Sequence, residues 1–322
     1  MPTGLLQQML TVIVDEITQM WWFFLASILL VGIIKGYRLD MRIRNSLNHH
    51  GMLGVVCAVL VGLISPLCAC GILPIIISLA MMGTPLAPIL ALLATSPTMS
   101  PDAFLLTWQG LGSEWAWLKL GGATLLGLGV GSLTLLLQRQ GHLTGELLRF
   151  APSYRDDGTL ASAYEIGREH GIPVKTMTII PREKHWRFIL DRTIDAGIFT
   201  GKYLLLAIIL EAIIVTTLPI HWITGLVGQK SFASVVVAAL VGIPLPLNQI
   251  PAIPVLAGLL QKGMNHGAAF TLLLAGPVTS LPAIIALSGV FKMRVMVFFL
   301  LTVLGIAITL GWVSLFFLPL PA

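Results

Sequence analysis

Charged side chains are scarce in this sequence. Only 10% of its 322 residues are Asp, Glu, Lys or Arg, whereas 56% are hydrophobic. A soluble domain carries about 25% charged residues, so this chain cannot cover a water-facing surface in the usual way. Apolar runs near the membrane-spanning length of about 20 residues recur along it. The composition therefore predicts a polytopic integral membrane protein, whose clearest runs are 20–34, 51–67, 118–137, 203–218 and 295–317.

Cysteines and enzyme motifs are also scarce. Three cysteines are too few for a disulfide framework, and we interpret them as free thiols. The sequence contains no HExxH metal motif and no GxSxG nucleophile turn. The segment 197–203 resembles a phosphate-binding loop, but it is one residue short and lacks the final Ser or Thr. We therefore expect no cofactor and no enzymatic activity.

Basic residues are concentrated in two loops. Of the 19 Lys and Arg residues, four lie within 35–44 and nine within 139–192. Basic residues in short loops resist translocation and stay on the cytoplasmic side of a membrane. The net charge of +5 is thus a topology signal, and we expect no nucleic-acid partner. Segment 138–192 is predicted to be a cytoplasmic linker.

The chain repeats itself at a fixed offset. Aligning position 51 with position 231 places 51–106 on 231–286 without a gap, and 16 of the 56 pairs are identical. Matches of Pro and Gly are informative because these residues punctuate helices. The offset therefore predicts an internal duplication. Such matches are Gly62 with Gly242, Pro66 with Pro246, Pro74 with Pro254, Gly83 with Gly263, and Pro97 with Pro277.

Loop charges predict that the two copies have opposite orientations. The loop before the first copy is basic, whereas 219–230, before the second, holds a single Lys. Copies that enter the membrane from opposite sides are common in secondary transporters. We predict an all-α polytopic membrane protein with about ten (8–10) transmembrane helices in two inverted five-helix repeats. Residues 1–137 would form the first repeat with an N-terminal interfacial helix, and 193–322 the second.

Proline-rich segments interrupt the predicted spans twice in each copy. Proline removes an amide donor and clashes with the preceding turn. In lipid the freed carbonyls need partners, so such breaks are tolerated inside the protein or along a watery cavity. The alternative is simple kinking. We predict breaks at Pro66, Gly71, Pro74, Pro97, Pro101, Pro246, Pro251, Pro254 and Pro277, and substrate contacts from Ser96, Thr98, Asn248, Gln249, Thr279 and Ser280.

Cys68 and Cys70 lie two residues apart within the Pro-rich segment 65–74. A thiolate is a soft ligand that prefers Cu(I), Zn(II) or thiophilic metalloids. Two thiols do not complete a tetrahedral zinc site, but incomplete coordination suits a site that must release its cargo. The alternative is a small buried apolar residue, which is our interpretation of Cys57. The pair is a candidate metal or metalloid site.

Two acidic residues fall in or beside predicted spans. Glu211 lies inside an apolar run, and Asp102 follows the break that contains Pro97 and Pro101. An acid near the bilayer centre costs about 2.5–3.5 kcal/mol on insertion scales, which marks such residues as functional candidates. Either residue is a candidate for ion coupling. The alternatives are a helix cap for Asp102, and a hydrogen-bonded or snorkelling side chain for Glu211.

Several of these residues resemble a known family. Pro66-Leu67-Cys68-Ala69-Cys70-Gly71-x-x-Pro74, followed by Ser96-Pro97-x-x-x-Pro101-Asp102, resembles the predicted-permease family that includes the bacterial organoarsenical efflux permeases. Gly258-Leu259-Leu260-x-Lys262-Gly263 carries the same resemblance in the second half. The resemblance implies that Cys68 and Cys70 bind trivalent methylated arsenicals. Asn248-Gln249 stands where family members can carry further cysteines.

Together these features predict a bacterial inner-membrane exporter of a thiophilic metal or metalloid species, working by alternating access. An ion gradient would drive it, or it would act as a uniporter, since no nucleotide motif is present. The expected partners are the lipid bilayer and a small inorganic or organometalloid substrate, with a homo-oligomer left open. One alternative is a permease for a small organic solute or anion. Another is a membrane thiol oxidoreductase, which would need a CxxC pair.

Overall fold

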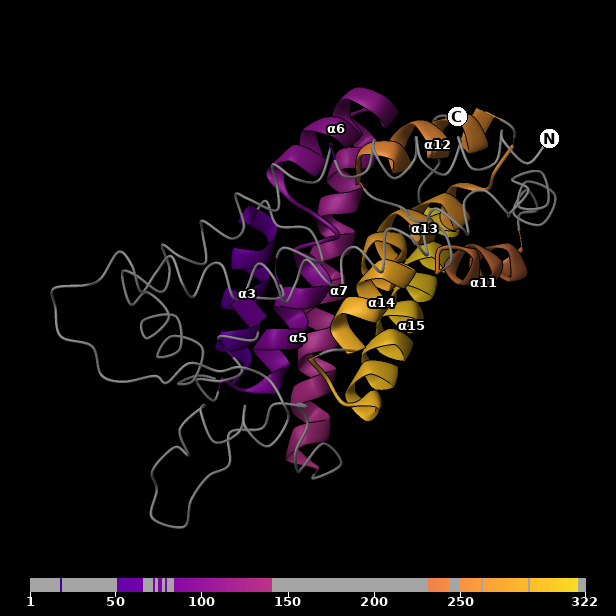
Figure 1. The fold of residues 1–322 in the computed structure, drawn as a ribbon. Helices are drawn as coiled ribbons and strands as arrows, with labels where there is room; N and C mark the ends of the chain where they lie inside the picture. The colour runs from indigo at the N-terminus through magenta and orange to yellow at the C-terminus, as the bar shows by residue number, and fades with distance from the viewer. Residues whose placement is uncertain are drawn as a thin grey trace, which may run out of the picture.

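The computed structural model describes residues 18, 51–65, 72, 75–76, 79, 84–140, 231–243, 249–261, 263–288 and 290–317. The regular elements in these ranges are α-helices (Figure 1). From the first half of the chain they are α3 (Met52–Ile64), α5 (Leu86–Thr95), α6 (Pro101–Leu111) and α7 (Ser113–Arg139). From the second half they are α11 (Phe232–Val241), α12 (Gln249–Gln261), α13 (His266–Thr279), α14 (Leu281–Ser288) and α15 (Met293–Phe317).

Helices in the two halves begin at matching positions. The same offset that aligns the two sequence copies carries the starts of α3, α5, α6 and α7 onto the starts of α11, α13, α14 and α15. Their packing recurs too, since α7 contacts α5 and α3 in the first half, and α15 contacts α13 and α11 in the second. In addition to these contacts within each half, α6 of the first half lies beside α12 of the second at one end of the bundle (Figure 1). The offset seen in the sequence is therefore also an offset in helix order.

Three stretches of helix are long and apolar enough to cross a membrane: Ser113–Arg139, His266–Ile285 and Met293–Leu315. Shorter apolar helices are Met52–Ile64, Leu86–Thr95 and Phe232–Val241. Large hydrophobic side chains on the long helices remain exposed, for example Trp117 and Leu301. Exposed apolar side chains on apolar helices are expected where the helices are surrounded by lipid. The prediction of a helical membrane protein is confirmed, while the number of crossings stays a prediction.

Local sequence signals fix several helix starts. The side chain of Ser231 accepts a hydrogen bond from the Ser234 amide at 3.3 Å and so caps α11. Asn265 caps α13 in the same way, with its Oδ1 3.1 Å from the amide nitrogen of Gly267. α6 begins at Pro101, whose missing amide donor would have no helical partner in the first turn.

Glycines on α7 bring neighbouring helices close. A Cβ at Gly122 would lie 2.6 Å from Phe270 Cζ of α13. One at Gly127 would overlap the hydroxyl of Thr95 on α5, and one at Gly131 would overlap Val55 on α3. Small residues at such contacts allow the close backbone approach that drives association of membrane helices. α7 is thus the helix on which both halves meet.

These contacts also fix helix directions. Gly127 and Gly131 meet Thr95 and Ala91 in reverse order, so α5 and α7 are antiparallel. Trp115 stacks on His266, and Gly122 meets residues further along α13, so α7 and α13 run the same way. It follows that α5 and α13, the equivalent helices of the two halves, run in opposite directions.

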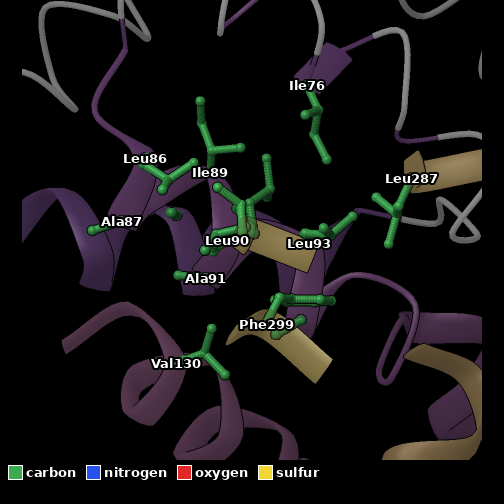
Figure 2. Close-up of a cluster of buried hydrophobic side chains, with 14 of the residues drawn as sticks. Ile76, Leu86, Ala87, Ile89, Leu90, Ala91, Leu93, Val130, Leu287 and Phe299 are labelled. Carbon is green, nitrogen blue, oxygen red and sulfur yellow. The ribbon is translucent and has the colours of Figure 1, made fainter. Parts of the chain in front are cut away.

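The buried apolar side chains form two clusters. In the first, Phe299 of α15 lies among Leu90, Leu93 and Val130 from the first half of the chain (Figure 2). The second gathers residues of α11, α12 and α13 around Ala123 of α7. Each cluster therefore combines helices of one half with residues of the other half, among them residues of its long helix.

Candidate functional site

The turn between α5 and α6 carries polar side chains in a fully buried place. Thr95, Ser96 and Thr98 are each 0% exposed. The hydroxyl of Thr95 donates to the Ala91 carbonyl oxygen at 2.8 Å, and that of Thr98 donates to the Ala94 carbonyl oxygen at 2.6 Å. Hydroxyls bonded back to the helix satisfy their donors and leave acceptor lone pairs available. Pro97 lies in this turn, and Pro101 starts the next helix.

The turn between α5 and α6 is the first buried break, and the second lies between α13 and α14. Thr279 is the last residue of α13, is 0% exposed, and donates from its hydroxyl to the Ala275 carbonyl oxygen at 2.9 Å. Ser280 follows it outside the helix, with φ −57° and ψ 146°. The amide of Leu281 then donates to the Ile243 carbonyl oxygen at 3.0 Å, which ties this turn to the end of α11.

The prediction of helix breaks is corrected at three prolines. α13 continues through Pro277 and ends two residues later, at Thr279. α12 continues through Pro251 and Pro254. Pro251 lies in the first turn, where its missing amide removes no helical bond. α13 ends downstream of Pro277 because a proline disturbs the helical turn before it. The residues after the proline can still continue the helix.

A residue in or beside each break packs in the apolar cluster of the opposite half of the protein. Met99, from the first break, belongs to the apolar cluster of α11, α12 and α13. Val278, beside the second break, belongs to the cluster built around α3 and α5. The substrate candidates Ser96, Thr98, Thr279 and Ser280 are therefore on segments that lie between the two halves.

Other predicted site residues lie outside the described part of the chain. They are Cys68, Cys70, Pro66, Gly71, Pro74, Pro246, Asn248 and Glu211. Gln249 is the first residue of α12. Among the described residues, no three His, Cys, Asp or Glu side chains gather as a metal-ligand set. The role of the cysteine pair thus stays a prediction.

A polar cluster that the sequence reasoning missed lies beside the first break. Lys119, on α7, is 1% exposed and is among the largest fully buried side chains in the described part of the structure. Its ammonium donates to the Thr107 hydroxyl at 3.4 Å, and Asp102 lies on the same helix as Thr107. We call Asp102, Thr107 and Lys119 the buried polar cluster.

The position of Asp102 is set by the start of α6. Ser100 occupies the cap position and Pro101 the first helical position, so Asp102 lies in the first turn, not at the cap. An acid there is favoured by the helix dipole. Its Oδ1 atom is buried and accepts no hydrogen bond from the described residues. The alternative role of a simple helix cap is therefore corrected.

A signal for Lys119 was available in the sequence. The offset between the two copies pairs it with Phe299, so a charged residue stands where the other copy has an aromatic one. Within a predicted span, such a difference between copies marks a residue that packing alone does not explain.

Comparisons with known proteins indicate a permease family. The family ArsP_1, described as "Predicted permease", matches residues 5–316. The chain is 23% identical over 297 residues to a Streptococcus mutans protein named "Putative two-component membrane permease complex subunit", covering 91% of this chain and 90% of that protein. It is 31% identical over 94 residues to "UPF0718 protein YcgR" of Bacillus subtilis, covering 29% of this chain and 32% of that protein.

A third relative is archaeal. "UPF0718 protein MJ0584" of Methanocaldococcus jannaschii is 29% identical over 87 residues, covering 27% of this chain and 24% of that protein. No solved structure matches the chain. The family match spans nearly the whole sequence, including both buried breaks and the described helices up to residue 316. The chain therefore belongs to the ArsP_1 family of predicted permeases.

Proposed function

We propose that this permease exports a thiophilic metal or metalloid species, such as a trivalent methylated arsenical, by alternating access between two inverted repeats. The observation that carries the proposal is the pair of buried polar turns at the ends of α5 and α13. Ser96 and Thr98 in the first turn and Thr279 in the second are 0% exposed, and each turn contributes a residue to the apolar cluster of the opposite half. A cargo held there would contact both halves at once.

The helix directions support the inverted arrangement. α5 and α13 begin at equivalent positions of the two sequence copies, and their contacts with α7 run in opposite order. Repeats of opposite orientation give a transporter two similar conformations, one open to each side of the membrane. In this proposal the units are 1–137 and 193–322, the linker 138–192 is cytoplasmic, and the protein resides in the bacterial inner membrane.

Cys68 and Cys70 supply the cargo chemistry of the proposal. They precede α5, whose C-terminal end carries the first buried break. Thiolates bind arsenic(III), copper(I) and zinc(II) more strongly than hydroxyls do. Two thiolates together with the hydroxyls of Ser96 and Thr98 would hold such a species without enclosing it completely. Release to the far side then needs only two soft ligands to exchange.

A partner subunit belongs to the proposal as well. The Streptococcus relative, which matches over most of both chains, is named as a subunit of a two-component permease complex. We extend this to the present chain as a second membrane subunit. A homo-oligomer is the alternative assembly.

A second candidate cargo is a small organic solute or anion. The described parts of both breaks carry hydroxyls, from Ser96, Thr98, Thr279 and Ser280, and these hydrogen-bond organic groups without any thiol. This candidate keeps the same transport path and removes the role of the cysteines.

Resistance of a metal-sensitive bacterial host tests the proposal. Cells expressing the chain are challenged separately with methylarsenite, arsenite, antimonite, copper and zinc, and growth is compared with cells carrying an empty vector. We expect protection against at least one thiophilic species, and loss of that protection in Cys68→Ser or Cys70→Ser. Protection that survives both substitutions would favour the organic-solute candidate, and protection against none would remove the proposed cargo class.

A further inference from the structure

α6 and α14 are equivalent helices of the two halves, but they are connected to the preceding helices differently. The offset between the two copies carries Pro101, the first residue of α6, onto Leu281, the first residue of α14. Residues 96–100 separate α5 from α6, whereas Ser280 alone separates α13 from α14. Hinges are formed by loop residues that absorb changes in backbone angle, so the longer connection before α6 offers more of them.

The start of α14 is held by a backbone hydrogen bond that α6 cannot make. The Leu281 amide donates to the Ile243 carbonyl oxygen at 3.0 Å and so fixes α14 to the end of α11. The equivalent residue of α6, Pro101, has no amide hydrogen. The corresponding bond between the start of α6 and the end of α3 therefore cannot form.

The other end of α6 is a glycine joint. Gly112 connects α6 to α7 with φ +101°, a backbone conformation that glycine adopts readily and other residues rarely do. A Cβ placed there would meet no atom within 4 Å. The offset pairs Gly112 with Lys292, and Val290 and Phe291 before it are buried in the first apolar cluster. α6 thus lies between two joints, and neither recurs at the equivalent positions around α14.

The buried contact between α6 and α7 is polar, whereas its equivalent in the second half is apolar. Thr107 accepts a hydrogen bond from the Lys119 ammonium at 3.4 Å, and both side chains are buried. The offset pairs these residues with Leu287 and Phe299, which belong to the first apolar cluster. Water can replace the hydrogen bond of an ammonium, but exposing Leu and Phe to water is unfavourable. At this contact, moving α6 away from α7 therefore requires less free energy than moving α14 away from α15.

α6 lies at the end of the bundle where α7 starts, beside α12 (Figure 1). The opposite end carries Arg139, the last residue of α7. It also carries Lys292 and Arg294 at the start of α15, because α15 runs antiparallel to α7. Basic residues near the ends of membrane spans mark the cytoplasmic side. Their position assigns α6 to the outer side of the membrane.

We propose that α6 is the outer gate of the cargo path, an inference that rests on the proposed alternating access. The structure has this gate closed, since Ser96 and Thr98 are 0% exposed. The hydrogen bond between Lys119 and Thr107 holds α6 in place, and α6 turns about its two joints when the bond breaks. The Lys119 ammonium then exchanges Thr107 for water, and the first buried break becomes accessible from outside. α14 keeps its place during this movement.

Acetylation of Lys119 by a membrane-impermeant amine reagent tests the gate, because this side chain is 1% exposed while α6 is closed. Sulfo-N-hydroxysuccinimidyl acetate is applied to the full chain in right-side-out and in inverted membrane vesicles. Mass spectrometry measures the rate of acetylation at Lys119, and methylarsenite flux is recorded in the same vesicles.

Three variants change the gate, and one serves as a control. Thr107→Val removes the hydrogen-bond acceptor, and Gly112→Ala strains the joint in its closed conformation. Pro101→Ala supplies the amide donor that the start of α6 lacks. The control is Thr124→Val, which removes a hydroxyl that bonds to a carbonyl oxygen of its own helix, α7.

We expect acetylation of Lys119 to be at least tenfold faster from the outer side than from the cytoplasmic side. Thr107→Val and Gly112→Ala should accelerate it at least threefold, and Thr124→Val should stay within twofold of wild type. Pro101→Ala should slow it at least threefold, a change that unfolding cannot produce because unfolding would expose Lys119.

Three results would overturn the gate: equal rates from the two sides, no acetylation of wild type, or a rate that none of the three variants changes. The labelling and the flux are read separately, so failure of the gate and failure of the cargo assignment are distinguishable. The expected labelling pattern without methylarsenite flux in wild type supports the gate and overturns the proposed cargo alone.

Discussion

Lys119 and Phe299 occupy equivalent places in two long helices that run in opposite directions, and each side chain is 1% exposed. Phe299 belongs to a cluster of buried apolar side chains, among them Leu90 and Val130 (Figure 2). Lys119 instead donates a hydrogen bond to the Thr107 hydroxyl at 3.4 Å. The two halves thus share a helical framework and differ in charge at one buried position.

This difference predicts unequal costs for breaking the hydrogen-bonded pair of Lys119 and Thr107 from its two sides. Thr107→Val removes the acceptor of a fully buried ammonium, and we expect a loss of about 1–3 kcal/mol in stability. Lys119→Met leaves a Thr107 hydroxyl that still donates to the Ala103 carbonyl oxygen, and we expect a loss of less than about 1 kcal/mol. Thermal unfolding in detergent measures both. Equal losses, or none, would show that the pair contributes nothing as a pair.

A second prediction moves the charge to the other half. Phe299→Lys places an ammonium among apolar side chains, with no acid from the described residues in its cluster. The expected loss is at least about 3–5 kcal/mol, because a buried charge stays uncompensated. Phe299→Leu is the matched control and should cost less than about 2 kcal/mol. The yield of folded protein on size-exclusion chromatography separates the two variants, and equal yields would contradict the apolar character of this site.

Helix contacts at the first break give a third prediction. Gly127→Ala would push a methyl group into the Thr95 hydroxyl, and overpacking of this kind costs about 1–3 kcal/mol. On the same helix, a Cβ at Gly121 meets nothing within 4 Å. Gly121→Ala should therefore be neutral or stabilise by up to about 1 kcal/mol, since alanine favours helix. Unfolding temperatures of the two variants check this, and indistinguishable values would place Thr95 elsewhere.

A fourth prediction concerns the hydroxyls of the break. Thr98→Val keeps the shape of the side chain and removes its hydroxyl, whose oxygen we place among the cargo contacts. Transport should fall roughly three- to tenfold, which corresponds to one lost hydrogen bond of about 0.5–1.5 kcal/mol. Thr124→Val removes an equivalent bond, from Thr124 to the Leu120 carbonyl oxygen at 2.8 Å, away from any break. Transport by this control should stay within twofold of wild type, and equal effects of both substitutions would argue against a cargo contact at Thr98.

Much of the fold was predictable because apolar runs and the positions of proline and glycine determine local structure. The apolar runs 118–137 and 295–317 lie within α7 and α15, and the gapless offset reappears as matching helix starts. Proline positions were less informative. Pro101 begins a helix, whereas Pro277 lies inside one, because a helix can continue for some residues past a proline.

The candidate site was only partly predictable from the sequence. Ser96, Thr98 and Thr279 were expected at polar breaks, and the structure places them at buried helix ends. The hydrogen bond between Lys119 and Thr107 was not foreseen, because the two residues lie on successive helices and their proximity depends on how α6 packs against α7. Sequence patterns report the period of one helix, and they do not report which residues of two helices meet.

Methylarsenite accumulation in everted membrane vesicles tests the central claim most directly. The comparison is between wild type, Cys68→Ser, Cys70→Ser and Cys57→Ser, the last being a half-buried thiol of α3 outside the proposed path. The account predicts energy-dependent accumulation by wild type and by Cys57→Ser, and at least a tenfold decrease in both Cys68→Ser and Cys70→Ser. Accumulation that is unchanged in those two variants, or lost equally in Cys57→Ser, would contradict a thiolate cargo site in this permease.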